Sequence, residues 1–252
     1  RTSRLHAEAR PAASARPRPH RPANAPPPSS TPAPKRSRSP RSPGWNRDPE
    51  TPVKQSIVTL DMEGVLTPEI WIAVAERTGI PELRRTTREE PDYDKLMNYR
   101  IGIMDRHGVT LSRIQEVIGG LEPLPGALDF LAELRRRTQV IILSDTFEQF
   151  AHPLMRRMEW PTLFCHRLVV ENDRITGYRL RLPDQKRRAV EALQALNYRV
   201  IAAGDSYNDT TMLGQADHGF LFHAPENVVR EFPRFPALER YDELLQRITG
   251  CL

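Results

Sequence analysis

Short apolar runs alternate with amphipathic segments along most of the chain. The runs are rich in Val, Ile and Leu, as strands buried on both faces require. They are Ser56–Leu60, Gln139–Leu143, Leu163–Val170, Tyr198–Ala203 and Gly219–Phe222. Between them, leucine and valine recur at helical spacing, as at Leu128, Leu131 and Leu134 and at Val190, Leu193 and Leu196. This alternation predicts an α/β fold, a doubly wound parallel sheet of the Rossmann-like type.

Two segments interrupt the alternation. Residues 68–125 show helical periods without a strand, which predicts a small helical cap inserted after the first strand. Arg167–Leu182 has an alternating pattern with turn residues at Glu171–Asp173 and Thr176–Gly177, which predicts a β-hairpin extension. The α/β core is then expected in residues 55–67 and 126–252.

Residues 1–54 differ in composition from the rest of the chain. They hold 13 of the 24 prolines, and 12 of the 37 Lys and Arg against 3 of the 32 Asp and Glu. With so few apolar residues we expect a disordered tail. One interpretation is a basic arm for nucleic acid. We favour a dispensable extension, or upstream sequence read through a misplaced start with Val53 as the alternative start, and expect no nucleic-acid partner.

Cysteine usage and hydropathy narrow the class of protein. Cys165 and Cys251 have neither metal-ligand nor disulfide-framework spacing. No apolar run reaches the roughly 18 residues that a bilayer-spanning helix needs. We therefore expect a cytoplasmic protein with no membrane partner. A homodimer is one option that the sequence leaves open.

Four polar pieces follow apolar runs or begin helices. Asp61 and Glu63 come after the first run, Ser144 closes the second, Lys186 begins a helix, and Gly204–Asp209 follow a later run. Asp61, Ser144 and Lys186 alone are each typical of a helix cap or a solvated side chain. Gly204–Asp209 is more specific, because two carboxylates around a Gly-containing turn after a buried strand are costly without a cation. Because the carboxyl ends of parallel strands meet at one edge, the ordered set predicts a single phosphate-handling site.

The carboxylates suit covalent phosphoryl transfer. Asp61 can attack phosphorus and form an aspartyl phosphate, and Glu63 can protonate the leaving oxygen and then activate the second nucleophile. Asp61 and Asp205, with the backbone carbonyl of Glu63, offer hard oxygen ligands for Mg²⁺. Lys186 supplies a mobile positive charge for the phosphoryl group.

Further residues are expected around the phosphate. Ser144 offers a hydroxyl at a strand-to-helix turn, and Asp145 offers its backbone N–H while its side chain caps the helix. Asn208 and Asp209 lie at the next helix start, with Asn208 toward the substrate and Asp209 in or near the second metal shell. Three histidines are scattered and are expected to have no catalytic role: His107, His152 and His166.

These motifs resemble those of the haloacid dehalogenase-like phosphatase superfamily, from about Lys54 to the C-terminus. The closer resemblance is to phosphoserine phosphatases, and among them to the bifunctional phosphoserine phosphatase/homoserine phosphotransferase group. That group is similar in Asp61–Leu66 and in the following Pro68–Ile72. Most of the superfamily has Asp two residues after the nucleophile, where this chain has Glu63.

The resemblance implies a substrate and its contacts. It implies Mg²⁺-dependent hydrolysis of phosphoserine, and transfer to homoserine when homoserine takes the vacated acceptor position. Glu69 resembles the carboxylate that meets the substrate ammonium, and Arg100 the arginine that holds the substrate carboxylate. From the residues alone, Glu69 also suits a helix N-terminus, and Arg100 an exposed helical position.

Two rival functions share some of these features. A phosphatase for another small phosphorylated metabolite would keep the four motifs without needing Glu69 or Arg100. A nucleic-acid-binding protein could act through its basic tail on an inactive scaffold. An ion-pumping ATPase with the same aspartyl chemistry would need membrane helices, which the hydropathy excludes.

Overall fold

The computed structural model describes residues 54–86, 89–90 and 92–252. The disorder expected for residues 1–54 therefore concerns a segment that lies, except for Lys54, outside the described residues. None of the described helices has both the length and the apolar character of a bilayer-spanning segment.

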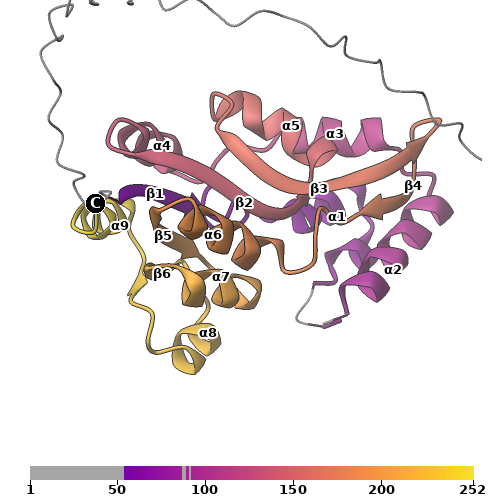
Figure 1. Cartoon of the computed structure of the whole chain (residues 1–252). Coiled ribbons are helices and arrows are strands. Elements are labelled where there is room, and N and C mark those ends of the chain that lie inside the picture. The colour runs from indigo at the N-terminus through magenta and orange to yellow at the C-terminus, as the bar shows by residue number, and fades with distance from the viewer. Residues whose placement is uncertain (1–53, 87–88, 91) are drawn as a thin grey trace, which may run out of the picture. The chain divides into compact units, whose positions relative to one another are not determined.

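A seven-stranded sheet runs through the centre of the described chain, in the order β4-β3-β2-β1-β5-β6-β7 (Figure 1). Neighbouring strands are parallel except for the antiparallel pair β3 and β4. The strands are β1 (Gln55–Leu60), β2 (Gln139–Phe147), β3 (Thr162–Glu171), β4 (Arg174–Arg179), β5 (Tyr198–Gly204), β6 (His218–Phe222) and β7 (Ala237–Leu238). The α/β parallel sheet is confirmed, whereas β7 is too short to leave a periodic signal and was not predicted.

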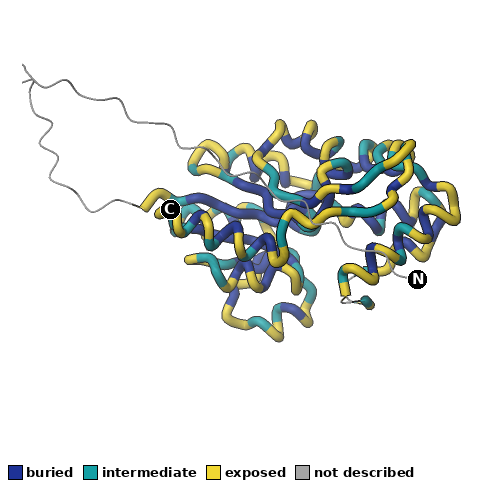
Figure 2. Tube along the Cα trace, turned by 45° about the vertical axis from the view of Figure 1, so that its right-hand side comes forward, coloured by how far each residue is buried: buried dark blue, intermediate teal, exposed yellow. Residues whose placement is uncertain are grey.

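Helices cover both faces of this sheet because successive strand residues point to opposite sides. In β1, Ile57 packs in one hydrophobic core and Val58 in the other. The Ile57 face is covered by α6 (Gln185–Ala195), α7 (Thr210–Gln215) and α8 (Glu226–Glu231). The Val58 face is covered by α4 (Ala127–Arg135), α5 (Glu148–Arg157) and α9 (Tyr241–Thr249). Figure 2 shows burial concentrated along the central strands between these layers.

Two leucines that the sequence pattern predicted on the inner faces of helices are exposed in the structure. Leu128 is 43% exposed and Leu196 is 70% exposed. Successive steps of three residues drift around a helix by about 60° each, because one turn takes 3.6 residues. The buried stripe of α4 is therefore Ala127, Phe130, Leu131 and Leu134.

The helical insertion after β1 is confirmed. It contains α1 (Ile70–Thr78), the 3₁₀ helix η1 (Pro81–Arg84), α2 (Tyr93–Arg106) and α3 (Leu111–Gly119). The side chains of Asp92 and Thr110 cap α2 and α3. Trp71 in α1 meets Phe150 in α5 edge to face, with ring centroids 5.3 Å apart, so this insertion shares a core with the sheet. The exact division into core and cap at residues 67/68 and 125/126 stays a prediction.

The hairpin extension is also confirmed, as β3 and β4. Asn172 and Asp173 connect them with φ of 50° and 64°, the left-handed geometry of a tight hairpin turn. The Asp173 carboxylate accepts hydrogen bonds from the backbone N–H and the hydroxyl of Ser112. The hairpin is thereby joined to the start of α3.

The end of β2 differs from the prediction. The strand continues to Phe147, and its pairing with β3 shifts register between Leu143 and Phe147. Ser144 and Asp145 therefore lie in an irregular strand end, and the expected strand-to-helix turn at Ser144 was wrong. The helix α5 begins only at Glu148, and its N-cap residue, Phe147, provides no side-chain capping hydrogen bond.

Candidate active site

The site lies where β1 and β5 end side by side. Leu60 pairs with Ala203, and the backbone N–H of Asp61 donates to the carbonyl of Ala203 at 3.0 Å. Asp205 follows β5 by one residue. Parallel pairing therefore brings the two carboxylates to the same edge, as the sequence indicated.

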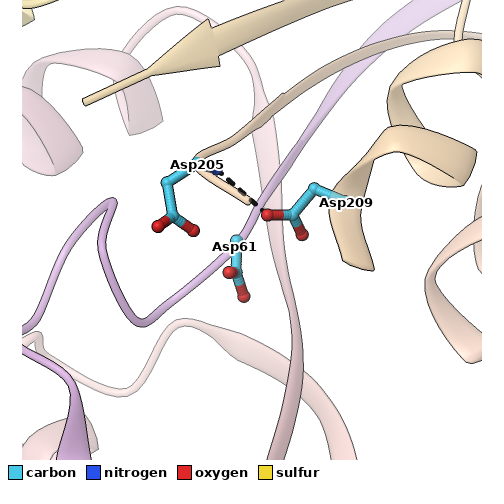
Figure 3. A group of neighbouring side chains, drawn as sticks. All are labelled: Asp61, Asp205 and Asp209. Carbon is cyan, nitrogen blue, oxygen red and sulfur yellow. Dashed lines mark hydrogen bonds between the residues drawn. The ribbon is translucent and has the colours of Figure 1, made fainter. Parts of the chain in front are cut away.

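A third carboxylate, Asp209, completes a buried cluster with Asp61 and Asp205 (Figure 3). One oxygen from each lies within 4.8 Å of the others. Asp209 ends η2 (Tyr207–Asp209), and its Oδ2 accepts hydrogen bonds from the backbone N–H groups of Asp205 at 3.0 Å and Ser206 at 3.1 Å. Asp209 therefore fixes the loop that presents Asp205.

Two glycines permit this close approach. A Cβ at Gly64, where φ is +79°, would lie 2.5 Å from the Asp205 carboxylate. A Cβ at Gly204 would lie 2.4 Å from the Asp209 side chain. Both distances are far inside van der Waals contact, so the motifs around Asp61 and Asp205 require glycine at these positions.

Lys186 enters the cluster from the start of α6. Its Nζ lies 2.7 Å from Asp209 Oδ1, 2.9 Å from Asp61 Oδ1 and 3.5 Å from Asp145 Oδ2. Burial opposes its charge, but the surrounding carboxylates Asp209, Asp61 and Asp145 raise the pKa of Lys186 well above its usual range. The ammonium group is therefore held in its charged form.

Negative charge exceeds positive charge in this cluster, which favours binding of a metal cation. Among the described residues, Lys186 is the only cation within 4.0 Å of any of the three carboxylates, and it contacts Asp61 and Asp209. Burial and repulsion from Asp209 raise the pKa of Asp61 well above its usual range and that of Asp205 to about 7. Buried carboxylate oxygens that repel one another are a donor set that fits a hard divalent cation.

Glu63 lies near this cluster, and its carboxylate contacts the first residue of α1. Its Oε2 accepts a hydrogen bond of 2.9 Å from the backbone N–H of Ile70, the first residue of α1. Burial, followed by repulsion from Glu69, raises the pKa of Glu63 to about 7. The structure thus places Glu63 beside the cap, and a role for its backbone carbonyl at a metal stays a prediction.

Arg100, expected either at the substrate or at an exposed helical position, is only 5% exposed. Its guanidinium stacks over the Trp71 ring at 4.4 Å, and one terminal nitrogen donates to the Arg85 carbonyl at 2.6 Å. Its buried Nε has no hydrogen-bond partner among the described residues. Burial lowers the pKa of Arg100 to about 10, against the attraction of Glu63 and Glu69.

Ser144 precedes Asp145 in β2, and Asn208 contacts the Asp145 side chain. Ser144 is 1% exposed, and its hydroxyl accepts from the backbone N–H of Thr146 at 3.2 Å. The Asn208 amide donates to Asp145 Oδ2 at 2.9 Å. The Asp145 side chain therefore does not cap a helix, and that expectation was wrong because β2 runs on past it. A cavity of about 340 Å³ is lined by Asp145, Lys186, Asn208 and Tyr93 of the cap, among others.

Two neighbours of this site were not predicted from the sequence. Gln185 and His166 both approach the Asp145 side chain. Neither has a local sequence signal, because their partners are 40 and 21 positions away in the chain. Asp209, given only a place in or near the second metal shell, lies in the carboxylate cluster, and its four-residue spacing from Asp205 is the signal for it.

Comparison with known proteins decides the family. A family model described as "haloacid dehalogenase-like hydrolase" matches residues 55–217. The chain belongs to the haloacid dehalogenase-like hydrolases. This hydrolase is 61% identical over 189 residues to a phosphoserine phosphatase of Pseudomonas syringae pv. tomato, across 75% of this chain and 80% of that protein. It is 60% identical over 189 residues to the phosphoserine phosphatase ThrH of Pseudomonas aeruginosa, across 75% of this chain and 92% of that protein.

Solved structures agree in fold. An apo phosphoserine phosphatase superimposes on the hydrolase with a TM-score of 0.64 at 18% identity, covering 77% of this chain and 98% of that one. A structure titled as a phospho-aspartyl intermediate analogue of phosphoserine phosphatase gives 0.65 at 18% identity, covering 77% and 99%. At such identities these similarities establish the fold alone.

Proposed function

We propose that this hydrolase is a Mg²⁺-dependent phosphoserine phosphatase, which converts O-phospho-L-serine to serine and phosphate through an aspartyl phosphate. One observation carries the proposal: a buried carboxylate at the end of β1, Asp61, lies 2.9 Å from a buried lysine and beside a second carboxylate, Asp205. The two Pseudomonas relatives named as phosphoserine phosphatases support the substrate.

The nucleophile in this proposal is Asp61. Its Oδ1 already accepts hydrogen bonds from the Met62 N–H at 2.7 Å and from Lys186. This leaves Oδ2 for attack on phosphorus, which forms the anhydride as the serine oxygen departs. Lys186 then neutralises part of the charge on the phosphoryl oxygens, with Ser144 and Asn208 as further hydrogen-bond donors.

Glu63 serves as the acid and base of the two steps. A carboxyl group with a pKa of about 7 exists in both protonation states near neutral pH. The protonated form gives its proton to the departing serine oxygen. The carboxylate left behind then removes a proton from the water that cleaves the anhydride.

The carboxylate cluster fits a divalent cation, which we propose to be Mg²⁺. Held by the carboxylates of Asp61 and Asp205 and the backbone carbonyl of Glu63, it would offset the negative charge that Asp61 and the phosphate bring together. EDTA should abolish turnover and added Mg²⁺ should restore it. Activity that survives exhaustive chelation would contradict the metal assignment.

The cap supplies selectivity for the serine part of the substrate. Arg100 presents a planar guanidinium with an unpartnered Nε, which suits a carboxylate, and Glu69 is an exposed carboxylate near Glu63, which suits an ammonium group. A zwitterion needs both contacts. A phosphate ester without these groups would lose them and keep only the phosphoryl contacts.

Homoserine is a second acceptor in this proposal, supported by the resemblance to bifunctional enzymes. Once serine has left, homoserine in the same position would give its hydroxyl proton to Glu63 and take the phosphoryl group. Incubation with phosphoserine, with and without homoserine, would show whether phosphate appears free or as phosphohomoserine. A panel of other phosphorylated metabolites tests the rival substrate class, which would be favoured if phosphoserine ranked low.

The remaining proposals concern the setting of the protein. A cytoplasmic location and a homodimer are testable by cell fractionation and analytical sedimentation. Full activity of a chain without residues 1–54, with no loss of function in cells, would rule out a nucleic-acid role for that segment.

A further inference from the structure

The carboxylate of Asp145 connects three elements that carry the candidate phosphate contacts. Asp145 follows Ser144 in β2. Its Oδ2 accepts from Asn208 Nδ2 at 2.9 Å and lies 3.5 Å from Lys186 Nζ. Its Oδ1 accepts from Gln185 Nε2 at 3.2 Å, and the same Gln185 nitrogen donates to the carbonyl of Ser144. One side chain thus meets residues from α6 and η2.

A buried histidine approaches the same carboxylate from β3. His166 is 6% exposed, with the rings of Tyr93 and Phe147 each 6.3 Å from its own. Its Nδ1 accepts a hydrogen bond of 3.1 Å from the backbone N–H of Arg181. A neutral imidazole that accepts at Nδ1 carries its proton on Nε2. That nitrogen lies 3.6 Å from Asp145 Oδ1, so a positive ring edge faces the carboxylate.

These neighbours keep Asp145 ionised. Burial opposes its charge, but Lys186 and the polar groups of His166, Asn208 and Gln185 hold the pKa of Asp145 well below its usual range. All four groups present protons to the carboxylate. An asparagine at this position would offer one acceptor oxygen in place of two. Its NH₂ group would face one of the donors and could not accept a hydrogen bond from it.

We infer that Asp145 is a positioning residue for phosphoryl transfer, which holds Lys186 and Asn208 in the orientation that meets the phosphoryl group and is itself held by Gln185 and His166. The inference rests on the proposed phosphatase activity, although not on phosphoserine as the substrate. It gives a role to two side chains, His166 and Gln185, that the reaction steps above do not use.

Asp145 acts on the phosphoryl side of the site and not on the serine side. Both of its oxygens already have donors from the protein. A substrate ammonium would compete there with four protein donors, since Lys186 and His166 also face this carboxylate. Loss of Asp145 should therefore slow every phosphate ester alike, whereas a residue that binds the ammonium would matter only for phosphoserine.

The first experiment measures kcat and KM for Asp145→Asn with phosphoserine and with p-nitrophenyl phosphate. We expect kcat to fall by roughly 10- to 100-fold, as for other groups that orient a reacting side chain, with little change in KM and the same factor for both substrates. The matched control is Glu148→Gln, which removes an exposed charge three residues away, next to Arg167. It should leave both constants unchanged.

The second experiment is a double-mutant cycle with His166→Asn. Asparagine keeps an acceptor for the Arg181 N–H and removes the group that faces Asp145. We expect a several-fold loss of kcat from His166→Asn in the wild-type background and none in the D145N background, because His166 acts through Asp145. Thermal unfolding of each variant shows whether the assayed protein is folded. If D145N does not fold, His166→Asn alone is decisive, and unchanged kcat on both substrates would refute the inference.

Three results for these variants would contradict a positioning role for Asp145. Unchanged kcat in folded D145N, additive losses in the cycle, or a loss confined to phosphoserine would each overturn the inference. If the wild-type protein hydrolyses p-nitrophenyl phosphate but not phosphoserine, the proposed substrate fails, and the loss of kcat in D145N and the double-mutant cycle still test the inference with the aryl ester.

Discussion

Two groups of charged residues, one at the strand ends and one that includes residues of the cap, differ in whether a buried polar atom is left without a hydrogen-bond partner. In the core cluster (Asp61, Lys186, Asp205 and Asp209), Lys186 contacts two members directly, and both oxygens of Asp209 accept hydrogen bonds. In the cap cluster (Glu63, Glu69 and Arg100), the buried Nε of Arg100 has no hydrogen-bond partner in the described chain.

From this difference we expect the core cluster to govern phosphoryl transfer and the cap cluster to govern selectivity among substrates. The core cluster is held in place by the protein before any ligand arrives, as phosphoryl transfer from any ester requires. In the proposed function, a substrate carboxylate supplies the acceptor that Arg100 Nε lacks, and leaving a buried donor unsatisfied costs about 1–3 kcal/mol. Mutations in the core cluster should therefore affect all substrates, and those in the cap cluster should discriminate among them.

The largest expected effect comes from Asp61→Asn. An amide cannot form the anhydride, so turnover of phosphoserine and of p-nitrophenyl phosphate should both fall by roughly 10⁴- to 10⁶-fold. Thermal unfolding should show no loss of stability, since the change removes one of three crowded carboxylates. Asp129→Asn, an exposed position on α4, is the control with normal activity. Substantial residual turnover would contradict the nucleophile assignment.

Glu63→Gln should have the next largest effect and should sharpen the comparison. Loss of a general acid costs roughly 10²- to 10⁴-fold in the step that expels serine, whose alkoxide is a poor leaving group. The value of kcat/KM for p-nitrophenyl phosphate should fall much less, because p-nitrophenolate leaves without a proton. The exposed Glu82→Gln is the control. An equal loss of kcat/KM on both esters would argue against protonation by Glu63.

Arg100→Ala tests the cap cluster directly. Removing hydrogen bonds to a charged carboxylate should lower kcat/KM for phosphoserine by roughly 10- to 100-fold, with little change for p-nitrophenyl phosphate. Arg100→Lys keeps the charge but loses the planar guanidinium. It should also lower kcat/KM for phosphoserine more than for p-nitrophenyl phosphate, but by a smaller factor than Arg100→Ala. Arg106→Ala, exposed on the same helix, should be neutral. Equal losses on both esters would remove Arg100 from the substrate site.

The smallest effect concerns stability and links metal binding to pH. In metal-free protein, the pKa of Asp205 is about 7 when folded, well above that of an unfolded aspartate. The folded state then binds more protons, so the free energy of unfolding decreases as pH rises from about 4 to about 7. A divalent cation binds the deprotonated carboxylates and restores this loss, so the rise in Tm caused by Mg²⁺ should be larger at pH 8 than at pH 5. An equal or larger rise at pH 5 would contradict this linkage.

The central sheet could be predicted because its signal is local. Buried parallel strands such as β1 and β5 need continuous apolar runs, and the residue after each run must lie at the ligand-binding edge. Asp61 and Asp205 could therefore be placed together from sequence alone. Helical faces were less certain, since Leu128 follows the right spacing from Leu131 and Leu134 yet is exposed.

The environment of Asp145 could not be predicted, because it depends on contacts between distant residues. The register shift at the end of β2 keeps Asp145 in the strand, where Asn208 and Gln185 reach it from 63 and 40 positions away. Sequence offered only the local alternative, a helix cap. The burial of Arg100 was equally hidden, because it depends on Trp71 from another helix.

The proposed mechanism requires that Asp61 is phosphorylated during each turnover. Wild-type protein can be mixed with phosphoserine, treated with borohydride and digested, and the peptide that contains residue 61 can be analysed by mass spectrometry. An aspartyl phosphate is reduced to homoserine by this treatment, so we predict homoserine at position 61 in turning-over enzyme and unmodified aspartate in enzyme without substrate. Unmodified Asp61 in actively turning-over enzyme, or reduction at another carboxylate, would contradict the account.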